Sequence, residues 1–158
     1  MKKQKGFSLI ELLIVVAIIL IIAAIAIPNL LRSRMAANEA SAVGSLRTIN
    51  TAEVTYATNY PTEGFAANLA ALGGAAPCST AQVANACLID EVLSTTAKKS
   101  GYSFLAPGTG ALPRVAYTAT AVPTLVGSSG QRAFFTDQSG VIRYDLTGGG
   151  ATTASPAL

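Results

Sequence analysis

The chain has 158 residues, of which 51% are hydrophobic and 12% charged, and its formal net charge is +3 at pH 7. This length suits one membrane helix and one small domain. Histidine is absent, which excludes histidine-dependent catalysis and a histidine metal site, and no pair of carboxylates stands out as an acid–base dyad. The composition therefore indicates a protein that is not an enzyme, calls for no cofactor or metal, and lacks the broad basic field of a nucleic-acid-binding protein.

A short basic leader opens the chain. Lys2, Lys3 and Lys5 precede the first apolar stretch, which predicts an amino end that stays in the cytoplasm while the remainder is exported. An ordinary secretory signal is cut after its apolar core, but here the small residue Gly6 stands before that core. We therefore expect residues 1–6 to be a cleaved leader. Without its three lysines, the eleven basic side chains fall to eight and balance the eight acidic ones, which favours self-association.

Residues 7–28 follow as a predicted transmembrane helix. Between Phe7 and Ile27 only Ser8 and Glu11 are polar, and at about 1.5 Å per residue this stretch spans about 32 Å, close to the roughly 30 Å of bilayer hydrocarbon. A charge at the centre of a membrane helix costs on the order of 3 kcal/mol, and less near its end. Glu11 therefore needs a neutralising partner, unless the segment is a plain signal anchor that happens to carry an acid.

Cleavage after Gly6 supplies such a partner. It creates a new amine at Phe7, about one helical turn from Glu11 in the same chain. In a filament, the amine of one subunit can meet the carboxylate of the next in a core of low dielectric. Breaking a buried ion pair costs about 3–5 kcal/mol, so the pair would orient neighbouring subunits strongly. We expect Phe7 and Glu11 to act together in assembly.

The helical pattern continues over residues 29–60. The apolar positions there are Leu30, Leu31, Met35, Val43, Leu46, Ile49 and Tyr56, and the interleaved charged ones are Arg32, Arg34, Glu39, Arg47 and Glu53. Apolar residues in steps of mostly three or four predict an amphipathic continuation of the first helix. We expect it to end near Asn59, ahead of Pro61. Pro28 removes one backbone hydrogen bond and predicts a kink in this helix.

Residues 61–100 are rich in Ala and Gly, which predicts a loop region with short helical pieces within 81–96. The only cysteines of the chain, Cys78 and Cys87, lie here. In an exported domain such a pair predicts a disulfide. Two reduced thiols would fit a cytoplasmic domain instead, and a metal site would need more soft ligands than two.

The last third of the chain predicts strands at 102–106, 114–121, 133–136 and 141–145. Gly- and Ser-containing turns separate them, so we expect a three- or four-stranded antiparallel sheet over residues 101–147. Its apolar face needs a partner, which the outer half of the long helix can provide. The predicted fold class is therefore α+β. Residues 148–158, rich in Gly, Ala, Thr and Ser, are expected to form a flexible tail.

The run from Gly6 to Glu11, behind a short basic leader, resembles the class III leader of type IV prepilins. The resemblance implies the ladle-shaped pilin fold, with a long helix as handle and a globular head. It also implies that a prepilin peptidase cuts after Gly6 and methylates the amine of Phe7. The segment before Pro28 can lose helical structure in filaments of this family. An assembly platform with an ATPase would add monomers from the inner membrane to a helical homo-oligomer.

The implied function is that of a structural subunit, a major or major-like pilin, of a type IV pilus that serves adhesion, twitching motility or DNA uptake. The chain would lie in the bacterial inner membrane with a cytoplasmic amino terminus, and in an extracellular pilus after assembly.

A pseudopilin of a type II secretion system is the alternative function. The commonest major pseudopilin carries a calcium-binding loop and an aspartate-rich end, whereas the last third here holds only Asp137 and Asp145. An electron-conducting filament would need stacked aromatic residues, but only Phe7, Tyr56 and Tyr60 lie on or near the helix. Both alternatives therefore have less support than the pilin.

Overall fold

A computed structural model describes residues 6–74 and 78–158. The chain forms two compact units, an amino-terminal unit over Met1–Arg34 and a carboxy-terminal unit over Met35–Leu158. The predicted leader lysines, Lys2, Lys3 and Lys5, lie outside the described residues.

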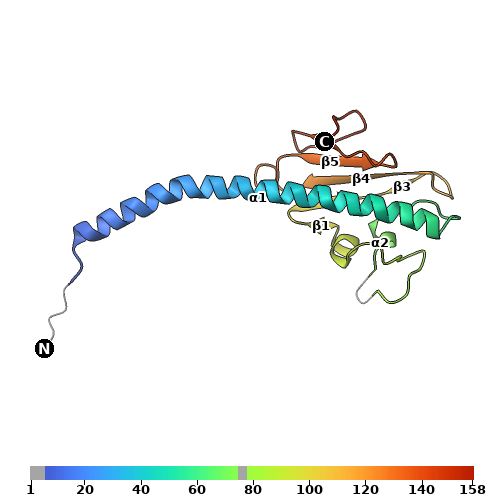
Figure 1. The fold of residues 1–158 in the computed structure, drawn as a ribbon, viewed down its shortest axis with the longest axis horizontal. Helices are drawn as coiled ribbons and strands as arrows, with labels where there is room; N and C mark the ends of the chain where they lie inside the picture. The colour runs from blue at the N-terminus through green and yellow to red at the C-terminus, as the bar shows by residue number, and fades with distance from the viewer. Residues whose placement is uncertain (1–5, 75–77) are drawn as a thin grey trace. The chain divides into compact units, whose positions relative to one another are not determined.

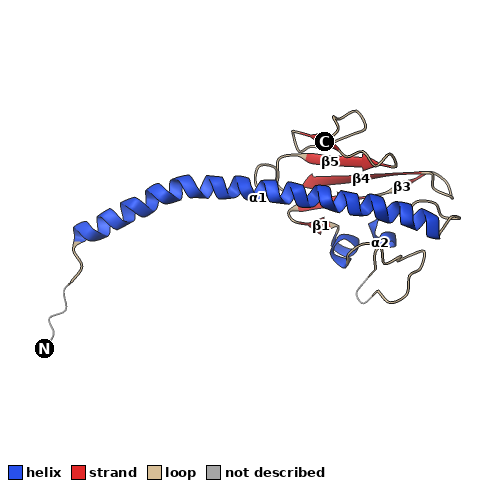
Figure 2. Cartoon of the chain, viewed as in Figure 1, coloured by secondary structure: helices blue, strands red, loops and turns tan. Residues whose placement is uncertain are grey.

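One long helix, α1, spans Leu9–Asn59 and contributes to both units (Figures 1 and 2). It ends at the predicted residue and begins two residues after the predicted start at Phe7. Helical structure continues through Pro28 without interruption. Among the described residues, α1 is the one helix long and apolar enough to cross a bilayer, with an 18-residue window of mean hydropathy 3.3.

The sheet belongs to the carboxy-terminal unit and is entirely antiparallel. Its strands are β1 Lys98–Lys99, β2 Tyr102–Leu105, β3 Gly108–Thr109, β4 Ala116–Pro123, β5 Ala133–Asp137 and β6 Arg143–Asp145. They follow the order β1-β2-β4-β5-β6, with β3 paired to β4 outside this path. The four predicted strands correspond to β2, β4, β5 and β6, which confirms the α+β class. The sheet begins earlier than predicted, because β1 precedes residue 101, and β1 and β3 raise the strand number above four.

The core lies between α1 and the inner face of the sheet. Along α1, Leu46 and Ile49 are fully buried, as the three- and four-residue spacing predicts. From the sheet, Ala119 on β4 and Phe134 on β5 are also fully buried. Strand β4 alternates buried and half-buried residues along its whole length, so one of its faces is directed toward the helix. Full burial of each large apolar side chain contributes about 1.5–3 kcal/mol.

Two short helical pieces occupy the loop region. Helix α2, Leu69–Leu72, is capped by the Asn68 side chain, which accepts a hydrogen bond from the Ala71 N–H. A single π-helical turn, η1, spans Val92–Thr96, within the stretch predicted to hold helical pieces.

The last residues of the chain contact β6. The Leu158 N–H donates to the Ile142 carbonyl at 2.9 Å, and the Pro156 carbonyl accepts from the Tyr144 N–H at 3.0 Å. The Arg143 guanidinium donates to the Ser155 carbonyl. The composition of the segment 148–158, which predicted a flexible tail, did not indicate this pairing.

Candidate assembly site

Glu11 lies at the start of α1 and is engaged with the backbone. Its Oε2 accepts a hydrogen bond from the Ser8 N–H at 2.8 Å, and the Ser8 carbonyl accepts the helical hydrogen bond of the Leu12 N–H at 3.2 Å. This is half of a capping box, in which an acid in the first turn satisfies a free N–H at the helix start. Sequence analysis interpreted Glu11 only as a charge. The spacing Ser8-x-x-Glu11 before an apolar run was the signal for its second role.

Gly6 and Phe7 precede the helix and are exposed. The Phe7 side chain is 78% exposed, and a Cβ placed on Gly6 would meet no atom within 4 Å. Phe7 lies ahead of the first helical residue, and Glu11 contacts the backbone of Ser8. The leader junction therefore presents an open backbone and an accessible aromatic side chain.

The apolar residues of the amino-terminal unit are uncovered. Every Leu, Ile and Val from Leu9 to Leu31 is exposed, for example Ile10 at 65% and Ile25 at 70%. Such a surface is far larger than soluble monomers leave open to water. Lipid chains or other apolar helices are needed to cover it, and Pro28 lies within the same surface.

In the carboxy-terminal unit, two acids that sequence analysis placed among the interleaved polar residues are buried. Glu39 is 8% and Glu53 0% exposed. Both lie on the stripe of buried residues that includes Val43, Leu46 and Ile49, at spacings of three and four. That spacing could have indicated their burial, whereas sequence analysis named both only as charged residues interleaved with the apolar ones.

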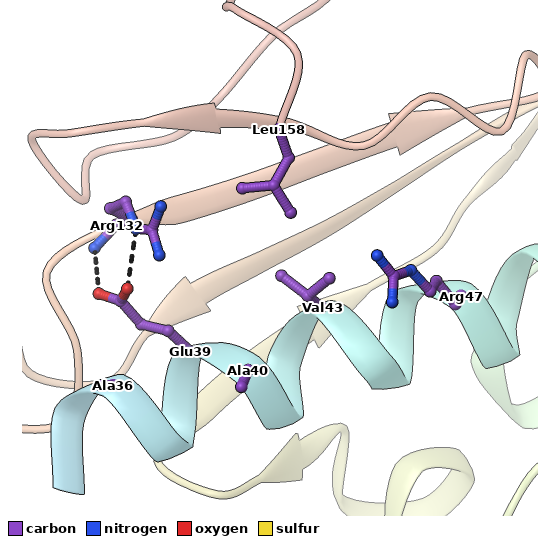
Figure 3. A pocket seen from close by; sticks show the side chains of 7 residues that line it. All are labelled: Ala36, Glu39, Ala40, Val43, Arg47, Arg132 and Leu158. Carbon is purple, nitrogen blue, oxygen red and sulfur yellow. Dashed lines mark hydrogen bonds and ion pairs between the residues drawn. The ribbon is translucent and has the colours of Figure 1, made fainter. Parts of the chain in front are cut away.

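Glu39 joins α1 to the segment before β5 (Figure 3). Its Oε1 accepts from the backbone N–H groups of Gln131 and Arg132, and its Oε2 accepts from the Arg132 guanidinium at 2.8 Å. Burial by itself would raise the pKa of Glu39, but these hydrogen bonds and the positive charge of Arg132 lower it below its usual value. Glu39 therefore links α1 to the segment before β5 through its charged carboxylate. We call its three hydrogen bonds to Gln131 and Arg132 the Glu39 brace.

Glu53 has a different environment. Its Oε2 accepts from the Ala66 N–H at 2.8 Å, whereas its buried Oε1 has no hydrogen-bond partner among the described residues. Burial raises the pKa of this carboxyl to about 7, against the lowering effects of the Ala66 N–H and the Arg114 charge. Glu53 is thus the buried acid whose charged form is poorly compensated.

The predicted disulfide is confirmed. Cys78 and Cys87 are bonded, with a Cα–Cα distance of 5.7 Å. The bridge closes a loop that packs beside α2, where the Cys87 N–H donates to the Gly73 carbonyl. Within the described ranges, no cluster of three or more Asp, Glu, His or Cys side chains is placed to hold a metal ion.

Comparisons with known proteins agree with the leader motif. Residues 1–27 match the model of the prokaryotic N-terminal methylation motif. The chain is 64% identical over 39 residues to the type IV wide pilus major component PilA4 of Thermus thermophilus, a match that covers 25% of this chain and 30% of that protein. It is 44% identical over 54 residues to the type IV major pilin protein PilA of Myxococcus xanthus, covering 34% of this chain and 24% of the relative.

The matched segments thus span less than a third of the length of either relative. No solved structure matches the chain. The methylation motif, the two pilin relatives and the α+β fold with its long first helix confirm the resemblance to type IV pilins.

Proposed function

We propose that this chain is a structural subunit, major or major-like, of a type IV pilus. The observation that carries the proposal is the uncovered apolar surface of α1 directly behind the Gly6-Phe7 junction. A surface of this kind is stable in a bilayer, and outside the bilayer it is stable only against other apolar helices. Copies of the same helix provide that cover in a filament.

In this mechanism the monomer is anchored in the inner membrane before assembly, with its amino end in the cytoplasm. A prepilin peptidase removes residues 1–6 and methylates the new amine of Phe7. The amine then pairs with Glu11 of a neighbouring subunit, and Pro28 weakens the helix near the point where packing requires it to adapt. An assembly platform and its ATPase supply the work of moving each apolar helix out of lipid.

The resulting fibre would serve adhesion, twitching motility or DNA uptake. The names of the two relatives, a pilus component and a pilin, support a structural rather than an enzymatic role. A pseudopilin of a type II secretion system is the second candidate, because it shares the leader and the first helix. The sparse acids of the last third, Asp137 and Asp145, favour the pilin.

Mass spectrometry of material sheared from the cell surface tests the proposal, together with electron microscopy of the same fraction. We expect long fibres whose subunit begins with methylated Phe7. A Gly6→Leu variant should retain residues 1–6 and stay in the membrane. Since a Cβ at Gly6 would meet no atom of the described residues within 4 Å, this block would lie in recognition by the peptidase rather than in folding. Normal mature fibres from the variant would contradict the proposal.

A further inference from the structure

A groove in the carboxy-terminal unit runs between α1 and the last residues of the chain (Figure 3). It has a volume of about 300 Å³. Ala36, Ala40 and Val43 line it from α1, with Leu158 on the opposite wall, and the paired Glu39 and Arg132 line it as well. A second hollow of about 260 Å³ continues it and shares Arg47 and Leu158. Arg47 therefore lines both hollows, and among the described residues that line them it is the one charged side chain without an ion pair.

Most charged side chains of this unit are already engaged within the chain. Ion pairs join Lys99 to Asp90, Arg114 to Glu63 and Arg132 to Glu39. Asp137 and Asp145 accept hydrogen bonds in their own turns, and Arg143 donates to the Ser155 carbonyl.

Within the described part of 35–158, three charged side chains have neither an ion pair nor a hydrogen bond: Arg47, Lys98 and Glu91. All three are exposed. Glu91 is the single acid among them, and it is followed by Val92, an apolar side chain that is 50% exposed. Glu91 and Val92 thus present an unpaired negative charge next to an exposed apolar side chain. This combination complements a groove that offers the unpaired Arg47 beside the apolar Ala36 and Ala40.

The two surfaces lie at opposite edges of the sheet. Val92 is the first residue of η1 and Glu91 is its N-cap, and η1 is followed after one residue by the edge strand β1. The groove lies at the other edge, where Leu158 is hydrogen-bonded to Ile142 just before β6. Complementary patches on opposite edges of one molecule form a head-to-tail contact, which repeats along an open helical array rather than closing into a dimer.

We propose that this groove receives the Glu91–Val92 segment of a second copy of the chain, with Glu91 pairing to Arg47 and Val92 lying over Ala36 and Ala40. The contact rests on the proposed pilus function, since it joins neighbouring subunits of the filament. It adds a specificity-determining contact between the globular units to the packing of the apolar helices.

Charge reversal tests the pairing in cells that assemble the full-length chain. The Arg47→Glu and Glu91→Arg variants should each lower the yield of sheared filaments by about tenfold, because like charges then face each other at the contact. The double variant should return to within about twofold of the unaltered chain, since reciprocal rescue is the signature of a direct pair. Equal amounts of processed subunit in the membranes separate an assembly defect from misfolding.

Lys98→Glu is the matched control, because it reverses the other cation whose side chain has neither an ion pair nor a hydrogen bond within the described part of 35–158, and this cation lies in β1, the strand that follows η1. It should leave filament yield unchanged and should fail to rescue Glu91→Arg. Rescue by Lys98→Glu as strong as that by Arg47→Glu would mean that only local charge balance matters, and would overturn the inference. Normal filaments from both single variants would overturn it too, while leaving the pilus function intact.

A photo-crosslinker gives an independent readout. Benzoyl-phenylalanine in place of Val92, activated in intact filaments, should attach to the tryptic peptide 35–47 or to the final peptide 144–158 of another subunit. Attachment elsewhere in the chain would refute the contact. If the unaltered chain forms no filaments at all, the pilus function fails and this contact fails with it.

Discussion

The Ser8 N–H donates to Oε2 of Glu11 at 2.8 Å, so the acid at the start of the apolar helix also satisfies a backbone group of its own chain. In the proposed filament, two roles would therefore compete for the same carboxylate: capping of α1 within the subunit and pairing with the Phe7 amine of a neighbour. Substitutions that keep one role and remove the other can separate them.

Glu11→Gln keeps a carbonyl oxygen that can accept from Ser8, but it removes the charge, whereas Glu11→Ala removes both. If the charge directs assembly, both variants should be processed normally and should lose filaments to a similar extent. Loss of the cap alone is worth about 0.5–2 kcal/mol. Quantitative microscopy of sheared filaments checks this, and near-normal assembly by Glu11→Gln would show that capping, not pairing, explains this residue.

Glu53 makes stability depend on pH. Its pKa is raised from 4.5 to about 7 in the folded chain, so the folded state holds a proton that the unfolded state releases. The free energy of unfolding is therefore highest below pH 4.5, where Glu53 is protonated in both states. It decreases as the pH rises through 7, by about 3 kcal/mol in all. Urea unfolding in detergent micelles, followed by circular dichroism at pH 5 and pH 8, should show this fall.

The Glu53→Gln variant is the control for that measurement, because it cannot ionise and can still accept from the Ala66 N–H. Its stability should change much less between pH 5 and pH 8. The chain has no histidine, so few other side chains titrate in this window. An equal decline in both proteins would assign the effect to another group, such as the terminal amine.

Local patterns in the sequence predicted much of this fold. The end of α1 at Asn59 follows from amphipathic spacing that stops before Pro61, and the Cys78–Cys87 bridge follows from the cysteine count in an exported domain. The Ser8–Glu11 contact was not predicted, but it could have been, because a capping box depends only on residues three positions apart.

Other features depend on partners that are distant in the chain. Strands β1 and β3 have two residues each, Lys98–Lys99 and Gly108–Thr109, and of these only Thr109 is of a type that favours strands. They exist because β2 and β4 offer edges for pairing. The burial of Glu39 likewise depends on the N–H groups of Gln131 and Arg132, more than ninety positions away.

Removal of the Glu39 brace should destabilise the carboxy-terminal unit. Glu39→Ala leaves two backbone N–H groups without their acceptor and should lower the free energy of unfolding by about 2–3 kcal/mol. Glu39→Gln should cost less, because it can still accept from that backbone, and the partly exposed ion pair with Arg132 is worth only about 0–1 kcal/mol. Urea midpoints rank the two variants, and the reverse order would contradict this division.

The disulfide should stabilise the loop region rather than the assembly surface of α1. Cys78→Ser with Cys87→Ser opens a loop with a sequence separation of 9, which the chain-entropy account values at about 2.5–3 kcal/mol. We expect a lower unfolding midpoint but unchanged leader cleavage, since the proposed cleavage site at Gly6 lies outside this loop. Proteolysis of intact filaments should then cut within 74–88. A variant that accumulates uncleaved would show that the bridge matters earlier, during export.

Gly64 is held against the backbone of Arg114, which precedes β4. It has a φ of +71°, and a Cβ there would overlap with three backbone atoms of Arg114. Gly140 has a similar φ of +73° but no atom within 4 Å of a Cβ. Gly140→Ala should therefore cost only the left-handed strain of about 1–2 kcal/mol.

Gly64→Ala should cost clearly more, because the Phe65 N–H to Arg114 carbonyl and Arg114 N–H to Glu63 carbonyl hydrogen bonds must lengthen as well. Those bonds hold the segment that carries Ala66 against the buried Oε2 of Glu53. Gly64→Ala should thus also reduce the pH dependence of unfolding, because Glu53 gains access to water and its pKa returns toward 4.5. The contrary result is that Gly64→Ala and Gly140→Ala lower the free energy of unfolding equally and leave its pH dependence unchanged. That result would mean that the close packing of Gly64 against Arg114 adds nothing to the cost of the left-handed backbone conformation.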